Sequence, residues 1–411
     1  MKQLLVHRVT RIVLVFASLA LAGAGAYFGM QALSSHVPPP PLGKCHLLTT
    51  KGRPTPFMQR CLIERSDDLV QRDGLGAIAT VQREADRHPV LLTMCHTAMH
   101  HVGRKEGVKL DDPEDVRAAM RAIPPQAASC GAGLMHGVLE GYVERHGLDH
   151  ETAQVFYEAS CRTATVPLDT MNCAHGLGHA IARKFSLDLP RILDVCEGMQ
   201  GAAAMNCVSA TYMSLAEGVD LTGGPMSSVR TTAQLTAFCD AHQPRYELLC
   251  IRWYPVAPDW TDVTLRQRME VCSGLAGDLR TECFMGIGRA GEDFDKVDHC
   301  VSIDSRELQA ACAYGETVAA FLHSRGAVLD RAARCDDAYG DGGLACALGV
   351  GRGAVLLGSV EDAAAYCRRF TDARTTWCRR GLDLAGEPLD GARAELVAVQ
   401  ALGAAVRSRT A

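Results

Sequence analysis

The sequence predicts an all-α protein: a disulfide-linked array of helical-hairpin repeats (an alpha-solenoid) behind one N-terminal transmembrane helix. Two observations support this prediction, the spacing of the cysteines and an uncharged segment near the N-terminus. Fourteen of the eighteen cysteines form seven couples whose members are 11 or 12 residues apart, and the couples recur about every 34 residues. The couples are Cys161/Cys173, Cys196/Cys207, Cys239/Cys250, Cys272/Cys283, Cys300/Cys312, Cys335/Cys346 and Cys367/Cys378. A period of this length is typical of helical repeats.

The cysteine couples are interpreted as disulfides. Structural metal sites space their cysteines by about two to four residues, and the couples lack such gaps. Regular pairs at the longer spacing indicate oxidised thiols, and therefore a compartment outside the reducing cytosol. Cys45 and Cys61 are expected to form a further local disulfide.

The N-terminal segment has the pattern of a membrane anchor. Lys2, Arg8 and Arg11 precede an uncharged stretch over 12–33, which is long enough to cross a bilayer as a helix. We expect a basic cytoplasmic tail over 1–11, a signal anchor over 12–33, and a single-pass membrane protein whose body is extracytoplasmic, either periplasmic or extracellular. A cleavable signal peptide is the alternative, since small residues at 22–26 offer cleavage sites. The anchor is favoured because apolar sequence continues beyond them.

The remaining chain divides by composition. A proline-rich linker over 34–44 is expected, within which His36–Leu42 forms a stiff, extended spacer. Three segments follow the linker: an N-terminal helical cap over 45–90, histidine-rich repeats over 91–185, and cysteine-paired repeats over 186–411 that end in a capping C-terminal helix. A repeat array grows without separate cores, so one elongated body accounts for this length. A net charge of −5 and 5% aromatic residues give no basis for nucleic-acid binding.

Glycines recur three positions after the second cysteine of a unit. They are Gly133, Gly176, Gly286, Gly315, Gly349 and Gly381. Glycine inside a helix costs about 1 kcal/mol relative to alanine. A disulfide requires Cα atoms roughly 5.5 Å apart, whereas helix axes pack about 8–10 Å apart, so we expect these glycines to admit the partner helix. Gly286–Gly291 also matches the dinucleotide-binding fingerprint, but no strand precedes it, and we interpret it as packing glycines.

Histidine and glutamate pairs four residues apart mark three consecutive units. They are His96 and His100, His136 and Glu140, and His175 and His179. Residues four apart lie on one face of a helix, and successive pairs are 40 and 39 residues apart, about one repeat. Later units carry Arg289 and Arg352 at the position of His179, so the histidines are not a feature of the repeat itself. The arginines are interpreted as a solvated helix face, with a surface for an acidic partner as the alternative.

Neighbouring repeats place equivalent helices side by side, so the three pairs are predicted to converge on a metal. The expected ligands are His96, His100, His136, Glu140, His175 and His179. Six donors suit either two transition-metal ions bridged by Glu140 or one open catalytic ion with supporting partners, and Glu140 is the candidate catalytic residue. His101 is a reserve ligand. Iron, zinc and copper all remain candidates, and structural histidines are the alternative.

Three motifs resemble a known family. Cys-His-x-x-x-His-x-x-Gly spans Cys95–Gly103, His-Gly-x-x-Glu spans His136–Glu140, and His-Gly-x-Gly-His spans His175–His179. Together they resemble a family of extracytoplasmic bacterial and archaeal helical proteins. Members often carry another cysteine shortly before the position of Cys130, which this chain lacks, so the pairing of Cys95 with Cys130 stays open. The construction is also similar to that of the HEAT-repeat hydroxylase of deoxyhypusine, where histidine and glutamate pairs on stacked helices hold two irons.

Two functions from different classes follow. The first is a membrane-anchored metalloenzyme, an oxidase, hydroxylase or hydrolase. The second is a disulfide-linked repeat scaffold that binds a protein or peptide partner along one face. The polarity of the histidine cluster favours the first, and metal storage or delivery lies between them.

Overall fold

The computed structural model describes residues 41–49, 55–124, 127–162, 167–218, 223–241, 244–256, 263–290, 298–324, 335, 343–357, 360–385, 387 and 393–408. Every element assigned within these ranges is an α-helix or a 3-10 helix, and none is a strand. The predicted all-α class is therefore confirmed for the described chain. The predicted anchor over 12–33 and most of the proline-rich linker lie outside the described residues.

The helices follow one another along the chain in two groups. The N-terminal helices are α2 (Pro56–Asp73), α3 (Ile78–Arg87), α4 (Pro89–Gly107), α5 (Pro113–Ala122), α6 (Ala128–His146), α7 (His150–Ser160), α8 (Pro167–Lys184), α9 (Leu189–Glu197) and α10 (Gly201–Glu217). The C-terminal helices are α11 (Thr232–Ala241), α12 (Glu247–Trp253), α13 (Leu265–Ser273), α14 (Gly277–Ala290), α15 (Asp298–Val301), α16 (Arg306–Ser324), α18 (Gly343–Leu357), α19 (Val360–Cys367), α20 (Ala373–Leu382) and α21 (Arg393–Ser408). The 3-10 helices are η1 (Leu42–Leu48), η2 (Leu75–Ala77), η4 (Pro225–Ser228), η5 (Pro244–Tyr246) and η6 (Tyr254–Val256).

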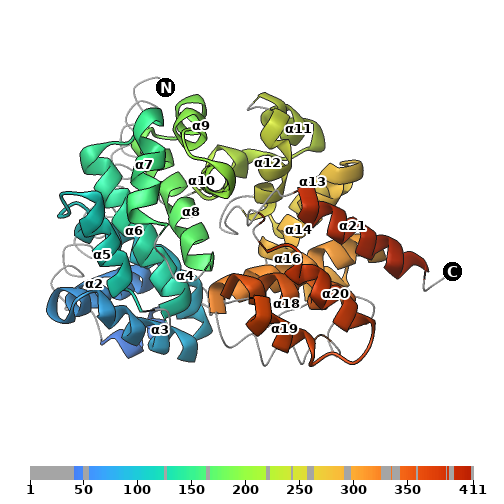
Figure 1. Cartoon of the computed structure of the whole chain (residues 1–411), viewed down its shortest axis with the longest axis horizontal. Helices are drawn as coiled ribbons and strands as arrows, with labels where there is room; N and C mark the ends of the chain where they lie inside the picture. The colour runs from blue at the N-terminus through green and yellow to red at the C-terminus, as the bar shows by residue number, and fades with distance from the viewer. Residues whose placement is uncertain are drawn as a thin grey trace, which may run out of the picture.

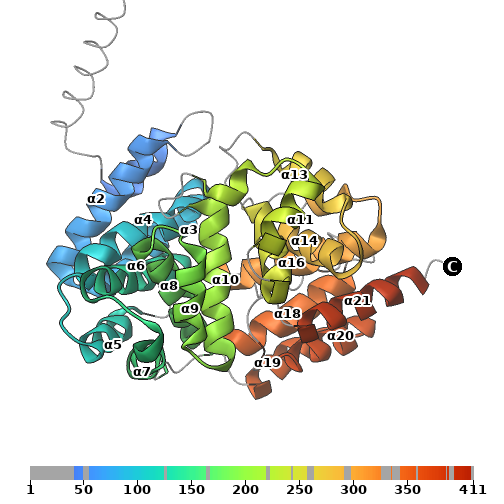
Figure 2. The same cartoon turned by 90° about the horizontal axis from the view of Figure 1, so that it is seen from above.

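The even-numbered helices from α4 to α20 form a row in which each one packs against the next. Odd-numbered helices cover this row, with α7 packed against both α5 and α9. Figures 1 and 2 show the blue-to-green helices α2–α9 and the yellow-to-red helices α13–α21 as two halves of the molecule. The halves meet where α16 contacts α6 and α18 contacts α8. There Leu356 of α18 packs with Leu168 and Met171 of α8.

Local signals explain where the helices begin and end. Asp149 caps α7 by accepting a hydrogen bond from the backbone N–H of Thr152, whose hydroxyl bonds back in a capping box. Asp112 caps α5, and proline occupies its first turn. Gly147 ends α6 at a φ of 79°, a conformation that favours glycine. These caps end α6 at His146 and begin α7 at His150, so only three residues separate a row helix from the covering helix that follows it.

Nine disulfides pair all eighteen cysteines, with Cα–Cα distances of 5.1–5.7 Å. The seven predicted couples are confirmed, and so is Cys45–Cys61. The open question is resolved, because Cys95 of α4 is bonded to Cys130 of α6. The second cysteine of a couple lies inside its helix, as Cys207 does in Gly201–Glu217, because the chain is already helical before it reaches the disulfide.

The repeated glycines do allow close helix packing. Gly133 does so as expected, since an added Cβ would collide with the carbonyl oxygen of His96 on the disulfide-linked helix α4, but others pack against a different helix. A Cβ added at Gly286 of α14 would collide with the carbonyl oxygen of Arg252 on α12, and one added at Gly315 of α16 would collide with that of Met285 on α14. The prediction that these glycines admit the disulfide-linked helix is therefore wrong for both positions. The row helices touch backbone to backbone. Disulfides such as Cys272–Cys283 and Cys300–Cys312 attach covering helices to the row, whereas Cys95–Cys130 joins two helices of the row itself.

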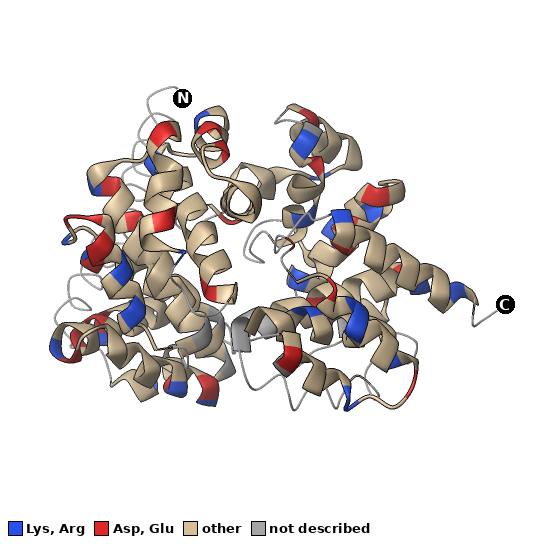
Figure 3. Cartoon of the chain, viewed as in Figure 1, with Lys and Arg blue, Asp and Glu red and all other residues tan. Residues whose placement is uncertain are grey.

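None of the helices in the described ranges combines the length and apolar character needed to cross a bilayer. Charged residues of both signs are interspersed along the described helices (Figure 3). Large apolar side chains that are exposed, such as Phe57 and Val155, lie far apart in the sequence and on separate helices.

Candidate metal centre

The three predicted pairs come from three adjacent helices of the row, α4, α6 and α8. The imidazole ring of His136, on the middle helix, lies at the centre of the group. Its centroid is 5.1 and 5.3 Å from those of His96 and His100, and 5.6 and 5.3 Å from those of His175 and His179. The structure thus brings all five predicted histidines together.

His96 and His100 face each other through their Nε2 atoms, which are 3.2 Å apart. The Nδ1 atom of His96 lies 3.2 Å from the carbonyl oxygen of Ser129. The Nδ1 atom of His100 lies 2.6 Å from Oε1 of Glu140. Both outer nitrogens are therefore held by oxygen atoms, and both Nε2 atoms point into the cluster.

Among the described residues, His96, His100 and His136 form a group whose potential ligand atoms all lie within 4.8 Å of one another. Three imidazole nitrogens at this spacing can hold a transition-metal ion. The predicted metal site is supported to this extent, and the identity of the ion is not given by the geometry.

Glu140 is buried, with an exposed fraction of 4%, and burial raises its pKa to about 7. We expected this carboxylate either to bridge two ions or to support a single open catalytic ion. Its Oε1 contacts the outer nitrogen of His100, and its Oε2 lies 3.6 Å from Nε of Arg104. A carboxylate in this position orients a ligating imidazole and selects its tautomer.

The other half of the cluster is more deeply buried. His136, His175 and His179 are 2%, 7% and 8% exposed. Burial holds the pKa values of His136 and His175 well below 6.5 and lowers that of His179 to about 3, with further lowering from neighbouring imidazoles. Nδ1 of His179 lies 2.9 Å from the hydroxyl oxygen of Ser214. Neutral imidazoles, the form that binds metals, are therefore favoured here.

His101, the reserve ligand, does not join the cluster, because Nη2 of Arg104 donates a 2.7 Å hydrogen bond to its Nδ1. Both residues instead line a small pocket beside His100 and Glu140, with Glu217 on another wall. A second pocket on the other side of Glu140 is lined by Arg183 and Lys184. The pocket that contacts the cluster and the neighbouring pocket beside Glu140 therefore both carry cationic side chains.

Sequence reasoning missed Arg104, Ser214 and Trp253. Arg104 is four residues after His100, so the same helical spacing could have found it. Ser214 was less visible, because it belongs to the next helix of the row and carries no histidine motif. Trp253 of α12 is 3% exposed, and its ring centroid is 6.0 Å from that of His175. Only the packing of the row brings it there.

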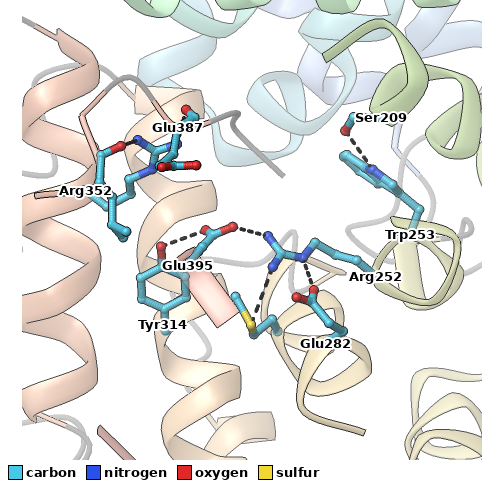
Figure 4. Close-up of polar contacts among 10 residues, drawn as sticks. Ser209, Arg252, Trp253, Glu282, Tyr314, Arg352, Glu387 and Glu395 are labelled. Carbon is cyan, nitrogen blue, oxygen red and sulfur yellow. Dashed lines mark hydrogen bonds and ion pairs between the residues drawn. The ribbon is translucent and has the colours of Figure 1, made fainter. Parts of the chain in front are cut away.

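A second buried polar group lies deeper in the C-terminal half (Figure 4). Nε of Arg252 is 2.6 Å from Glu282, and its Nη1 is 2.7 Å from Glu395. Tyr314 donates a 2.7 Å hydrogen bond to the other oxygen of Glu395. This network joins α12, α14, α16 and α21.

The two later arginines are not on a solvated face, so that prediction is wrong. Arg352 is 0% exposed and donates to the backbone carbonyl groups of Leu384 and Glu387. The guanidinium of Arg289 lies 4.7 Å from the ring centroid of Trp253, and burial lowers its pKa to about 10. Arg352 is buried and Arg289 partly buried, because their helices, like those of the histidines, turn this face toward the interior.

No protein-family model, no curated protein and no solved structure matches this chain.

Proposed function

We propose that this protein is an extracytoplasmic metal-dependent enzyme whose ion is bound by His96, His100 and His136, with hydrolysis as its reaction. The observation that supports the proposal best is the pair of Nε2 atoms of His96 and His100, 3.2 Å apart and with both outer nitrogens already engaged.

The hydrogen bonds select the tautomers. A carbonyl oxygen only accepts, so His96 must donate to Ser129 through Nδ1, and its Nε2 carries a lone pair. An ionised Glu140 likewise requires His100 to donate through Nδ1. The two Nε2 lone pairs then face each other and repel unless a cation lies between them.

A metal ion satisfies this geometry. With Zn–N bonds of about 2.0–2.1 Å and tetrahedral angles, two ligand nitrogens are about 3.3 Å apart. The observed 3.2 Å separation of the Nε2 atoms of His96 and His100 matches that value. His136 supplies a third nitrogen, since both of its ring nitrogens are buried without a hydrogen-bond partner.

The proton is the metal-free alternative. Burial raises the pKa of Glu140 to about 7, so a protonated Glu140 would donate to Nδ1 of His100. His100 would then carry its own proton on Nε2 and donate to His96. Metal uptake distinguishes the two arrangements. A site built for an ion takes up metal between the Nε2 atoms of His96 and His100, whereas a site held by the proton of Glu140 does not.

Hydrolysis is the reaction that suits the surroundings. Three histidines with one position left for water form a common catalytic zinc site, and the ion lowers the pKa of that water to about 7. The pocket beside His100 has a volume of about 30 Å³, room for about one or two water molecules next to the proposed ion. Arg104, in the same pocket, is placed to stabilise the negative charge that develops on a scissile group. Its contact with Glu140 holds it at the cluster.

The proposal also covers the compartment, the membrane anchor and the repeat architecture that the sequence predicts. Disulfides support an oxidising compartment. We propose that 12–33 anchors the protein in a membrane, with the catalytic body outside the cytoplasm, and that the row of helices is an alpha-solenoid. The three motifs remain a resemblance to extracytoplasmic helical proteins.

The test is metal uptake by the full-length, disulfide-intact protein. Chelator-treated protein would be loaded with Co²⁺, and bound metal would be measured by plasma mass spectrometry and visible absorption. We expect stoichiometric uptake, a spectrum of low coordination number, and a spectral change on addition of acetohydroxamate, which occupies an open position. His96→Ala and His100→Ala should lower occupancy, whereas the exposed His150→Ala is the matched control.

Protein without stoichiometric metal after loading with cobalt, zinc, copper and iron, with the His96→Ala variant melting like the parent, would contradict the proposal. The binding scaffold would then be the better description. Uptake without any response to acetohydroxamate would favour storage or delivery of the metal over catalysis.

A further inference from the structure

His136 has an unusual environment for a buried imidazole. Both of its ring nitrogens are buried, and neither has a hydrogen-bond partner. A neutral imidazole has one N–H donor and one lone pair, and each costs free energy when it is buried unsatisfied. The ion of the proposed function accounts for only one of the two nitrogens.

The second ring nitrogen of His136 has imidazole neighbours of its own, on α8. His136 lies on α6, between α4 and α8. On the α8 side, Nδ1 of His175 and Nε2 of His179 are also buried without partners. The cluster therefore contains further imidazole nitrogens that the first ion does not engage.

The tautomer of His179 follows from the same reasoning as before. The hydroxyl of Ser214 donates to the carbonyl oxygen of Ala210, at 3.0 Å, so its oxygen is an acceptor toward His179. Nδ1 of His179 therefore carries the proton, and its buried Nε2 carries a lone pair that faces the cluster.

The two sides of His136 have similar dimensions. Ring centroids on the α4 side are 5.0, 5.1 and 5.3 Å apart, and those on the α8 side are 4.9, 5.3 and 5.6 Å apart. The α8 group is only slightly wider, the largest separation being the 5.6 Å between the rings of His136 and His175. Among the described residues only the α4 group already has all its potential ligand atoms within 4.8 Å of one another.

We propose that His136 is a bridging ligand in a dinuclear centre. One ion is bound by His96, His100 and His136, and a second by His136, His175 and His179. The second ion displaces the ring proton of His136, which leaves to solvent, so the imidazolate binds one ion through each nitrogen. The ligand class is a first-row divalent ion that accepts all-nitrogen coordination, and Cu²⁺ or Zn²⁺ suits it best.

This inference rests on the proposed function for the first ion. The second ion and the bridge can nevertheless be disproved while the first ion stands. It assigns the bridging role to His136 and leaves Glu140 as the residue that positions His100. It also explains why His175, which does not line the pocket beside His100, is nevertheless part of the cluster.

The experiment uses full-length protein loaded with Cu²⁺. Plasma mass spectrometry would count bound ions, and electron paramagnetic resonance would measure the spins. We expect two ions per chain and, because an imidazolate couples two Cu²⁺ ions antiferromagnetically, far fewer spins than ions at low temperature. His175→Ala, which keeps the bridge residue, should bind one ion and recover the full signal of an isolated Cu²⁺. His150→Ala is the control and should match the parent in both measurements.

The outcomes separate the two proposals. One ion per chain in the parent, unchanged in His175→Ala, would overturn the dinuclear centre and leave the proposed function standing. Two ions with the spins of two uncoupled Cu²⁺ centres would overturn the bridge. No stoichiometric metal would overturn both. A His175→Ala variant that fails to fold would be replaced by His179→Gln, which should likewise bind one ion.

Discussion

Arg252 and Glu395 are 143 residues apart in the chain, yet Nη1 of the first lies 2.7 Å from Oε2 of the second in the interior. Glu282 contacts the same guanidinium, and Tyr314 donates to the same carboxylate (Figure 4). The pair joins the C-terminal helix α21 to α12 in the middle of the row. It therefore closes a long segment of chain that the local disulfides do not close.

Glu395→Gln should strongly destabilise the protein. The substitution leaves the buried Arg252 with one carboxylate partner in place of two, and breaking a buried ion pair by removing one partner typically costs about 3–5 kcal/mol. Thermal melting and denaturant unfolding measure the loss. Glu361→Gln, on an exposed position of α19, is the matched control. Equal melting temperatures for the two variants would show that the network does not hold α21.

Gly286→Ala should destabilise the protein by about 1–3 kcal/mol without altering its metal content. The added methyl group would collide with the backbone carbonyl of Arg252, which cannot move without separating α12 from α14. Gly76→Ala is the control, since the nearest atom to its added Cβ is 3.8 Å away. Unfolding curves and metal analysis of both variants test this. An unchanged curve for Gly286→Ala would contradict the close packing of the row.

Removal of the Cys95–Cys130 disulfide should lower metal affinity as well as stability. This bond connects the two helices that carry His96, His100 and His136, and its sequence separation is 35 residues against 11 for Cys367–Cys378. In the chain-entropy account the longer loop contributes about 1 kcal/mol more. Double Cys→Ala variants of each pair would be compared by unfolding and by metal titration. Equal metal affinities would indicate that packing alone sets the α4–α6 geometry.

The metal-free protein should lose stability as the pH falls below about 6.5. Burial lowers the pKa values of His100 and His179 from 6.5 to about 3. Between these values the unfolded chain binds protons that the folded chain does not, so this contribution is full above 6.5 and is lost as the pH falls toward 3. Denaturant midpoints measured in chelator from pH 7 to pH 4 should fall more steeply in the parent than in the His100→Gln/His179→Gln variant. Parallel profiles would show that these histidines titrate normally.

Metal binding should quench the fluorescence of Trp253. Its buried ring lies beside His175, with centroids 6.0 Å apart, so a paramagnetic Cu²⁺ ion on the α8 side would be very near. The parent titrated with Cu²⁺ should show a saturable decrease in emission that is largely absent in Trp253→Phe. Trp377→Phe, which alters a partly buried residue in the C-terminal half, is the control and should be quenched like the parent. Quenching that persists in Trp253→Phe would contradict this placement of the ion.

Much of the fold was predictable because it depends on local spacing. Cysteines 11 or 12 residues apart can pair only if the chain turns back between them, and a repeated turn predicts hairpins of helices. Histidines at 96 and 100, or at 175 and 179, share a helical face whatever surrounds them. The convergence of the three pairs needed only one further assumption, that equivalent helices of consecutive repeats are neighbours, and the structure shows this for α4, α6 and α8.

Other features depended on contacts between distant residues. Nothing in the local sequence of Arg352 distinguishes a solvated guanidinium from a buried one, because its exposure depends on which segments cover it and supply its acceptors. The sequence around Gly286 likewise does not determine whether this glycine packs against the disulfide-linked helix or against the previous helix of the row. The sequence by itself determined the helices, the set of histidines and every disulfide except Cys95–Cys130, which the structure supplied. The tertiary structure decided which ring nitrogens are engaged, because Ser129, Glu140 and Ser214 reach them only after α4, α6, α8 and α10 have packed together.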